Sequence, residues 1–206
     1  MLHNITLPAG KDIKLVKSIY DQKVSLRKTI INKINTLTPK AVKSSNEAIL
    51  KQVLSLPEYQ CAKTIFAFVG VGWEVDTKDL LLHALSGNKR LSVPLCVGQG
   101  RMEARFIRSL AELTVGFYGL LEPMESCPAC PVEEIDFALI PCVSCDRMCM
   151  RLGRGGGYYD RFLENMTCAN TAVCRNIALV DAIPIDPWDR AVDRVVTETN
   201  IYKRGN

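Results

Sequence analysis

The chain lacks the long apolar runs that a membrane-spanning helix needs. Its longest uncharged apolar stretches, near residues 64–73 and 137–145, cover about half of the roughly 20 residues that span a bilayer. The first residues also lack the apolar core of a signal peptide. No basic run is longer than two residues and the net charge is only +4, which is too little for a nucleic-acid-binding surface. We therefore expect no membrane partner and no nucleic-acid partner.

Two common nucleotide-binding patterns are absent as well. No Gly-Lys-Ser/Thr follows the glycine-rich segment, which excludes a Walker loop, and the GxGxxG spacing of dinucleotide-binding folds is missing. There is no internal repeat and no low-complexity tract. The 206 residues are 48% hydrophobic, which is enough for one ordinary core. We predict an N-terminal extension over residues 1–20, either disordered or helical, and one folded domain over residues 21–206.

Apolar patterning alternates along the chain between helical and strand periods. Helices are predicted over residues 12–37 and 158–165. A further helix follows Pro39 and includes residues 48–56, and one more begins at Asp76. Strands are predicted over residues 64–71, 90–96, 104–107, 137–143, 176–180 and 195–197. Strands interleaved with helices indicate a three-layer α/β/α sandwich around a mostly parallel sheet, within a single domain.

The most informative segment is RLGRGGGYYD, residues 151–160. Glycine permits a positive φ and a close approach of backbone N–H groups to a ligand, and N–H groups that open a helix bind phosphate. Arg151 and Arg154 can bind phosphate oxygens, and Asp160 offers a hard oxygen ligand for Mg²⁺. An apolar strand precedes the segment and a helix follows it. We therefore interpret it as a phosphate-binding loop rather than as a surface turn with two solvated arginines.

Cysteine is frequent, with nine residues, but the odd count suits a reducing compartment better than a disulfide framework. Cys127-x-x-Cys130 and Cys142-x-x-Cys145 have a spacing that could hold a tetrahedral Zn²⁺. The second pair lies at the end of a predicted buried strand, and the first lies in a proline-flanked loop. We favour cysteines used as small apolar residues over a zinc site.

Five segments together resemble the signature of the 5-formyltetrahydrofolate cyclo-ligases, also called methenyltetrahydrofolate synthetases. Besides RLGRGGGYYD they are KVSLR at 23–27, FVGVGWEVDT at 68–77, FYGLLEP at 117–123 and IPIDPWDRAVDRVVTE at 183–198. Their order from about Lys23 to Glu198 is more specific than any single motif. By this resemblance, residues 21–206 form a cyclo-ligase-like catalytic domain.

The resemblance implies an ATP-dependent conversion of 5-formyltetrahydrofolate to 5,10-methenyltetrahydrofolate, with release of ADP and phosphate through an N5-iminium phosphate intermediate. It implies ATP as co-substrate, Mg²⁺ as cofactor and small molecules as the only partners. We expect a monomer in the cytoplasm, with a mitochondrial location as the alternative.

The same resemblance implies the site residues. Arg154 and Tyr158 would be catalytic, and Asp160 and Asp189 would bind the metal. The folate would be bound by Val69, Glu74, Tyr118, Arg154, Gly155, Gly156, Gly157 and Tyr158. ATP would be bound by Lys23, Arg27, Arg151, Leu152, Gly153, Arg154, Gly155, Gly156, Gly157, Tyr158 and Tyr159.

Some of these residues have simpler interpretations. Lys23 and Arg27 share a helix face and, without the resemblance, would be taken as solvated charges. Glu74 can equally be a carboxylate favoured by the dipole of the following helix, and Tyr118 can be a core residue.

The chain also departs from the family pattern. Gly156 stands where a lysine is frequent, Cys149 replaces a turn glycine and Trp188 replaces a frequent histidine. Two alternative functions therefore remain: a catalytically weakened nucleotide- or RNA-binding protein of the same fold, and a sugar-phosphate isomerase or transferase that needs no ATP.

Overall fold

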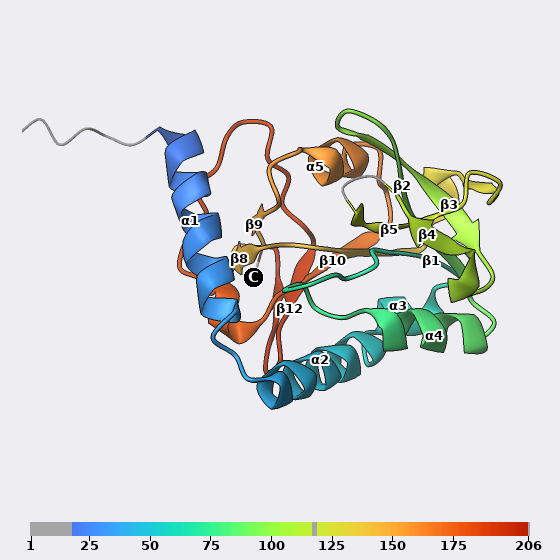
Figure 1. Cartoon of the computed structure of the whole chain (residues 1–206), viewed down its shortest axis with the longest axis horizontal. Helices are drawn as coiled ribbons and strands as arrows, with labels where there is room; N and C mark the ends of the chain where they lie inside the picture. The colour runs from blue at the N-terminus through green and yellow to red at the C-terminus, as the bar shows by residue number, and fades with distance from the viewer. Residues whose placement is uncertain (1–17, 117–118, 206) are drawn as a thin grey trace, which may run out of the picture.

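An eight-stranded sheet forms the centre of the molecule (Figure 1). The structure is a computed structural model, and it describes residues 18–116 and 119–205. The strand order is β13-β12-β10-β7-β1-β2-β3-β6. The strands are β1 Thr64–Ala67, β2 Arg90–Gly98, β3 Arg101–Ile107, β6 Ala129–Cys130, β7 Phe137–Ile140, β10 Ala169–Val173, β12 Arg194–Val196 and β13 Ile201–Lys203. Neighbours from β12 to β2 are parallel, and the pairings of β13, β3 and β6 are antiparallel.

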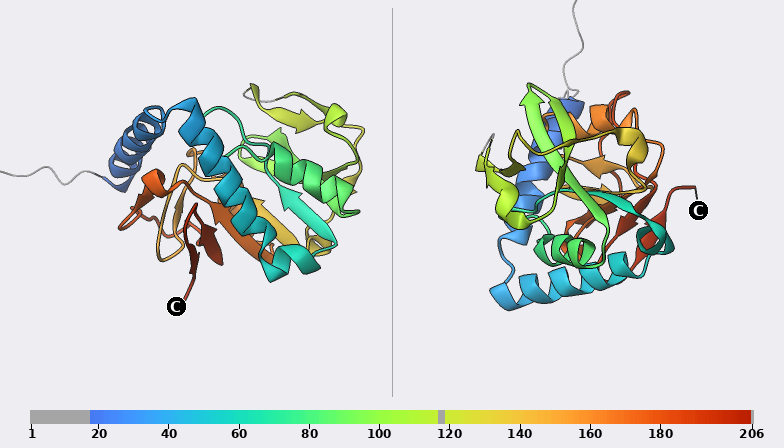
Figure 2. Two further views of the ribbon diagram at one scale, coloured as in Figure 1. Left: turned by 90° about the horizontal axis from the view of Figure 1, so that it is seen from below. Right: turned by 90° about the vertical axis from the view of Figure 1, so that its right-hand side faces the viewer.

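Helices cover both faces of this sheet. They are α1 Ile19–Ile34, α2 Pro39–Leu54, α3 Pro57–Cys61, α4 Lys78–Ser86 and α5 Tyr158–Leu163. In Figure 1, α2, α3 and α4 lie below the sheet, α5 lies above it and α1 flanks it on the left; Figure 2 shows the same layers from two further sides. One apolar cluster joins α2–α4 to the sheet, and a second joins α1 and α5 to the opposite face. These layers confirm the predicted three-layer sandwich.

Local sequence explains where the first two helices begin. The Ser18 hydroxyl accepts a hydrogen bond from the backbone N–H of Asp21 and so caps α1. Thr38 caps α2 in the same way, and Pro39 occupies its first turn, where a missing N–H costs nothing. The predicted helix over residues 12–37 thus corresponds to α1 from Ile19, and residues 1–17 lie outside the described part of the chain.

Smaller elements extend the sandwich. Strands β8 Ser144–Asp146, β9 Arg151–Leu152 and β11 Leu179–Val180 form a second sheet, and β4 Leu113–Val115 pairs with β5 Leu121–Pro123. Single 3₁₀ turns occupy Leu110–Glu112, Val132–Glu134 and Asn176–Ala178.

The prediction of a strand over residues 176–180 was wrong. This segment is a 3₁₀ turn followed by the two-residue strand β11, and the strand that pairs with β7 is β10 at Ala169–Val173. The sequence ANTAV of β10 is too polar and too short to show an apolar run, although Thr171 in it is fully buried. The position of β10 between two parallel strands, in a sheet with an apolar cluster on each face, therefore decided its structure rather than its own pattern.

Candidate active site

The glycine loop follows β9 and leads directly into α5. Arg151 and Leu152 pair with β8, so the start of the loop is fixed to a buried hairpin. Gly155 has φ +103° and Gly157 has φ +66°, conformations that favour glycine. Gly157 also precedes the first turn of α5. The glycine loop therefore lies between a strand and a helix as predicted, but the strand that leads into it is β9, because β8 separates it from the predicted strand over residues 137–143.

Two arginines, one on α1 and one on the helix that follows the loop, hold this loop in place. Arg27 of α1 donates from Nε to the carbonyl oxygen of Gly153 at 2.8 Å. Arg161 of α5 donates to the carbonyl oxygens of Gly100 at 2.6 Å and Gly156 at 2.5 Å. Burial lowers the pKa of Arg27, although attraction to nearby acidic groups opposes this shift. The loop is thus surrounded by positive charge, which suits an anionic ligand.

Arg154 reaches from the loop to the connection between β1 and α4. Its guanidinium contacts Oε1 of Glu74 through both Nε and Nη2, each at 2.9 Å, and lies 5.0 Å from the ring centroid of Trp73. The side chain of Glu74 is 7% exposed, whereas that of Arg154 is 46% exposed. The predicted phosphate ligand and the predicted folate ligand are therefore in direct contact.

A second arginine, Arg175, binds the main chain of Glu74. It follows β10, is almost fully buried and donates to the main-chain carbonyl of Glu74 at 3.0 Å. The same guanidinium binds Ser45 at 2.6 Å and Asn46 at 2.8 Å on α2. Arg175 and Trp73 were not predicted as site residues. Trp73 immediately precedes Glu74 in a segment already identified, whereas Arg175 follows the strand that the pattern failed to show.

The first predicted metal ligand, Asp160, lies in the first turn of α5. Arg151, with a side chain only 2% exposed, donates to Oδ1 of Asp160 at 2.8 Å. The backbone N–H of Arg190 donates to the same oxygen at 3.3 Å. This second contact brings the segment of Asp189, the other predicted metal ligand, against Asp160.

Asp189 is bound to Lys23 of α1. The Lys23 ammonium lies 2.5 Å from Oδ2 of Asp189 and 2.7 Å from Oδ2 of Asp186. Burial lowers the pKa of Lys23, but hydrogen bonds and attraction to both carboxylates outweigh it, so the pKa is raised. Lys23 is therefore a buried ion-paired residue and not a solvated charge. Asp186 was missed because no motif distinguishes it from the acidic residues around it.

The two tyrosines of the loop have different surroundings. The Tyr158 hydroxyl donates to the carbonyl of Gly98 at 3.2 Å, and its ring covers Gly156, where an added Cβ would lie 2.8 Å from ring carbons. Tyr159 packs against both apolar clusters, and Arg151 lies 5.8 Å from its ring centroid. Burial raises the pKa of Tyr159 well above its ordinary value. The absence of a side chain at Gly156 thus leaves room for the Tyr158 ring.

Of the remaining predicted folate residues, Val69 lies after β1 on the same connection as Glu74 and packs partly buried against the core. Tyr118 lies outside the described residues. The structure therefore brings Val69, Glu74, Arg154 and the loop to one edge of the sheet.

The four cysteines whose sequence spacing could hold Zn²⁺ do not form one group in the structure. Cys127 belongs to the apolar cluster on one face of the sheet and Cys130 to the cluster on the other. Cys142 and Cys145 instead lie beside Cys174. Cys149 has φ +66°, as expected where a turn glycine is replaced, and its side chain is fully buried.

Comparison with known proteins identifies the family of the chain. The model of the 5-formyltetrahydrofolate cyclo-ligase family matches residues 19–198. The chain belongs to this family. A 5-formyltetrahydrofolate cyclo-ligase of Mycolicibacterium smegmatis is 32% identical over 77% of this chain and 85% of its own length. The Escherichia coli K12 enzyme of the same name is 25% identical over 81% of this chain and 95% of its own length.

A solved structure shares the fold. The Aquifex aeolicus 5,10-methenyltetrahydrofolate synthetase superposes with a TM-score of 0.80 and 31% sequence identity, over 89% of this chain and 93% of that one. These likenesses confirm the predicted family and the predicted enzyme class, a ligase. Within residues 18–116 and 119–205, no helix has the length and apolar character to cross a membrane.

Proposed function

We propose that this cyclo-ligase family member converts 5-formyltetrahydrofolate to 5,10-methenyltetrahydrofolate at the expense of ATP, releasing ADP and phosphate. One observation carries the proposal: Arg154, from the loop that we propose binds phosphate, contacts Glu74, a buried carboxylate suited to a pterin. Because the proposed phosphate-binding group contacts the proposed folate-binding group, ATP and folate would meet there, as transfer of a phosphoryl group to the folate requires.

The chemistry follows from the substrate. The formyl carbon on N5 is amide-like and unreactive because nitrogen donates electrons into the carbonyl. Transfer of the γ-phosphoryl group of ATP to the formyl oxygen gives an N5-iminium phosphate with an electrophilic carbon. N10 attacks this carbon and loses its proton, and phosphate leaves as the methenyl ring closes. Since N10 belongs to the same molecule, proximity is already supplied, and the protein mainly positions groups and neutralises charge.

We assign the phosphate side to the glycine loop. The N–H groups of residues 153–157 and the Arg154 guanidinium would bind the phosphoryl group in transfer, with Tyr158 beside it. Lys23, Arg27 and Arg151 would stabilise the rest of ATP. Arg154 must exchange Glu74 for phosphate oxygens, or bind both, and its 46% exposure leaves it accessible to a ligand.

We assign the folate side to Glu74 and Val69. A carboxylate accepts hydrogen bonds from the amino and ring N–H groups of a pterin. Oε2 of Glu74 accepts from the backbone N–H of Val71 at 3.1 Å, which fixes the carboxylate. Tyr118 is retained as a proposed ring contact.

Asp160 and Asp189 fit a Mg²⁺ ion by donor type. Both supply hard oxygen atoms, and the contact of Arg190 N–H with Asp160 places their segments together. When bound, Mg²⁺ would neutralise charge on the phosphates of ATP. Arg151 and Lys23 already bind these carboxylates, so they would orient them.

A direct assay tests the proposal. Purified protein with MgATP and 5-formyltetrahydrofolate should develop methenyl absorbance, with one ADP and one phosphate released per product. ATP binding without product would instead favour a catalytically weakened nucleotide-binding protein, and product without ATP would contradict the phosphoryl-transfer chemistry. We further propose that the protein is a monomer and that it is located in the cytoplasm. The nine cysteines are free thiols, which suits a reducing compartment.

A further inference from the structure

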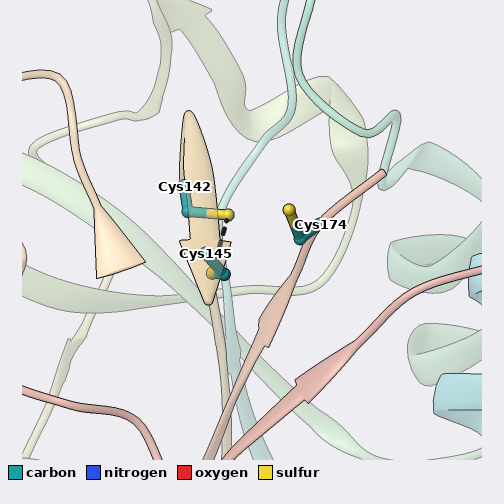
Figure 3. A group of neighbouring side chains, drawn as sticks. All are labelled: Cys142, Cys145 and Cys174. Carbon is teal, nitrogen blue, oxygen red and sulfur yellow. Dashed lines mark hydrogen bonds between the residues drawn. The ribbon is translucent and has the colours of Figure 1, made fainter. Parts of the chain in front are cut away.

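Three cysteine side chains converge beside the candidate active site (Figure 3). The sulfur atoms of Cys142, Cys145 and Cys174 all lie within 4.8 Å of one another, and those of Cys142 and Cys145 are 3.3 Å apart. Cys145 and Cys174 are buried and Cys142 is partly exposed. In Figure 3 the sulfur atoms of Cys142 and Cys174 point toward each other. We name this group the thiol triad.

The sheet topology brings the triad together. Cys142 follows β7 and Cys174 follows β10, and these two strands are parallel neighbours paired at Ala172 and Ile140. Their carboxyl ends therefore meet at the same edge. Cys145 lies on β8, opposite Arg151 of β9. The position of each thiol is thus set by the pairing of these strands.

We propose that the thiol triad binds one soft, thiophilic metal ion of the Zn²⁺ and Cu⁺ class. Thiolates select such ions over hard cations. A metal bonded to each sulfur at about 2.3 Å holds the sulfur atoms roughly 4 Å apart, which the triad reaches with shifts of less than about 1 Å. Within the described residues 18–116 and 119–205, no histidine or carboxylate joins the three sulfur atoms as a further ligand. Cu⁺ is satisfied by three sulfur ligands, whereas Zn²⁺ would add water as its fourth ligand.

The surrounding charges support a thiolate site. The buried Arg151 lies opposite Cys145, and the buried Arg175 follows Cys174 in the chain. Their positive charges offset the negative charge of a tris-thiolate complex. The ion would replace the thiol protons, including the Cys142 proton donated to the carbonyl of Val173 at 3.2 Å.

This site is separate from the proposed Mg²⁺ site, because soft sulfur ligands and hard carboxylates select different ions. It therefore does not rest on the proposed function, and its test uses no turnover measurement.

The test is a competition titration of the full chain under anaerobic conditions with a phosphine reductant. Zn²⁺ is added in one arm, and Cu⁺ in the other, each against a colorimetric chelator. We expect one equivalent bound in at least one arm, together with a rise in the melting temperature Tm. Cys174→Ser should weaken that affinity roughly 100-fold or more, because even losing a group that supports a metal ligand costs about 10–100-fold.

Cys130→Ser is the matched control. Cys130 is buried against the same face of the sheet but lies outside the triad, so this variant should keep the wild-type affinity. If Cys174→Ser does not fold, as judged by circular dichroism, the partly exposed Cys142→Ser provides the same test. Failure of both ions to compete with the chelator, or equal binding by triad variants and control, would overturn the proposal. A Cys142–Cys145 disulfide formed in air, with no ion bound anaerobically, would overturn it too.

Discussion

Arg154 and Glu74 are each assigned a role in ligand binding, yet they are bound to one another. Arg154→Lys keeps the positive charge beside Glu74 but removes the planar fork, which contacts Glu74 through two nitrogens and lies over Trp73. We expect kcat for methenyl formation to fall roughly 100-fold or more, as for other lost transition-state donors. Thermal unfolding should be nearly unchanged, because the buried carboxylate keeps a cation.

Arg108→Lys is the control for Arg154→Lys, since Arg108 is an exposed arginine on the connection after β3. It should retain wild-type kcat. A wild-type kcat in Arg154→Lys itself would remove Arg154 from the mechanism.

The metal assignment can be tested at two neighbouring carboxylates. Asp186 and Asp189 both contact Lys23, at 2.7 and 2.5 Å, but only Asp189 is proposed to bind Mg²⁺. Asp189→Asn should therefore raise the Mg²⁺ concentration needed for half-maximal turnover, while Asp186→Asn should leave it nearly unchanged. Asp160→Asn should act like Asp189→Asn, and their combination should be less than additive because both act through one ion. Equal Mg²⁺ dependence in all variants would make both carboxylates structural.

At the scale of secondary-structure elements, the junction between the glycine loop and α5 depends on one backbone conformation. Gly157 has φ +66°, and an added Cβ would lie 3.0 Å from the Arg161 guanidinium. Gly157→Ala should lower the free energy of unfolding by about 1–2 kcal/mol, because a left-handed conformation is strained for alanine. It should also raise the KM for ATP, since Arg161 holds the Gly156 carbonyl.

Gly98→Ala is a suitable stability control for Gly157→Ala. Gly98 has no positive φ, and an added Cβ would meet nothing within 4 Å. Urea unfolding of both variants beside the wild type would measure the difference. Equal stability of the two variants would show that the loop adapts to alanine without strain.

Local patterns predicted the elements whose own residues decide their structure. The glycine loop, α1 and the buried strand β7 were all visible from spacing and apolar runs. The strand β10 was not, because Thr171 is polar, and β10 is buried through its place between β12 and β7 in a sheet with an apolar cluster on each face. A pattern read along one segment carries no information about what covers that segment.

The candidate site was predictable where motifs marked it and not where distant residues completed it. Glu74 and Arg154 are 80 residues apart, and Arg175 reaches Glu74 across 101 residues. Such contacts depend on the order of the strands in the sheet, because this order decides which strand ends lie at the same edge. The hydrophobic periodicity of the sequence does not show this order. The thiol triad likewise depends on β7 and β10 being neighbours, whereas the cysteine spacing grouped Cys142 and Cys145 with the wrong partners.

At the scale of the whole molecule, the ion pairs of Lys23 connect α1 to the C-terminal part of the chain. It contacts Asp186 and Asp189 across more than 160 residues, and its side chain is only 9% exposed. Lys23→Met should lower the free energy of unfolding by about 1–3 kcal/mol at pH 8, because two adjacent carboxylates lose their shared donor. Lys28→Met, an exposed lysine of the same helix, should change it by less than about 0.5 kcal/mol.

The stabilisation by Lys23 should depend on pH in one direction. Its pKa in the folded protein is raised above the ordinary value of 10.5, so the folded state holds this proton more tightly than the unfolded state. The contribution is therefore complete below pH 10.5 and is lost as pH rises through the folded pKa. Urea unfolding at pH 8 and again above the folded pKa should show the gap between wild type and Lys23→Met closing in alkaline solution. A gap that stays constant across this range would mean that Lys23 stabilises the protein by the packing of its aliphatic chain rather than by its charge.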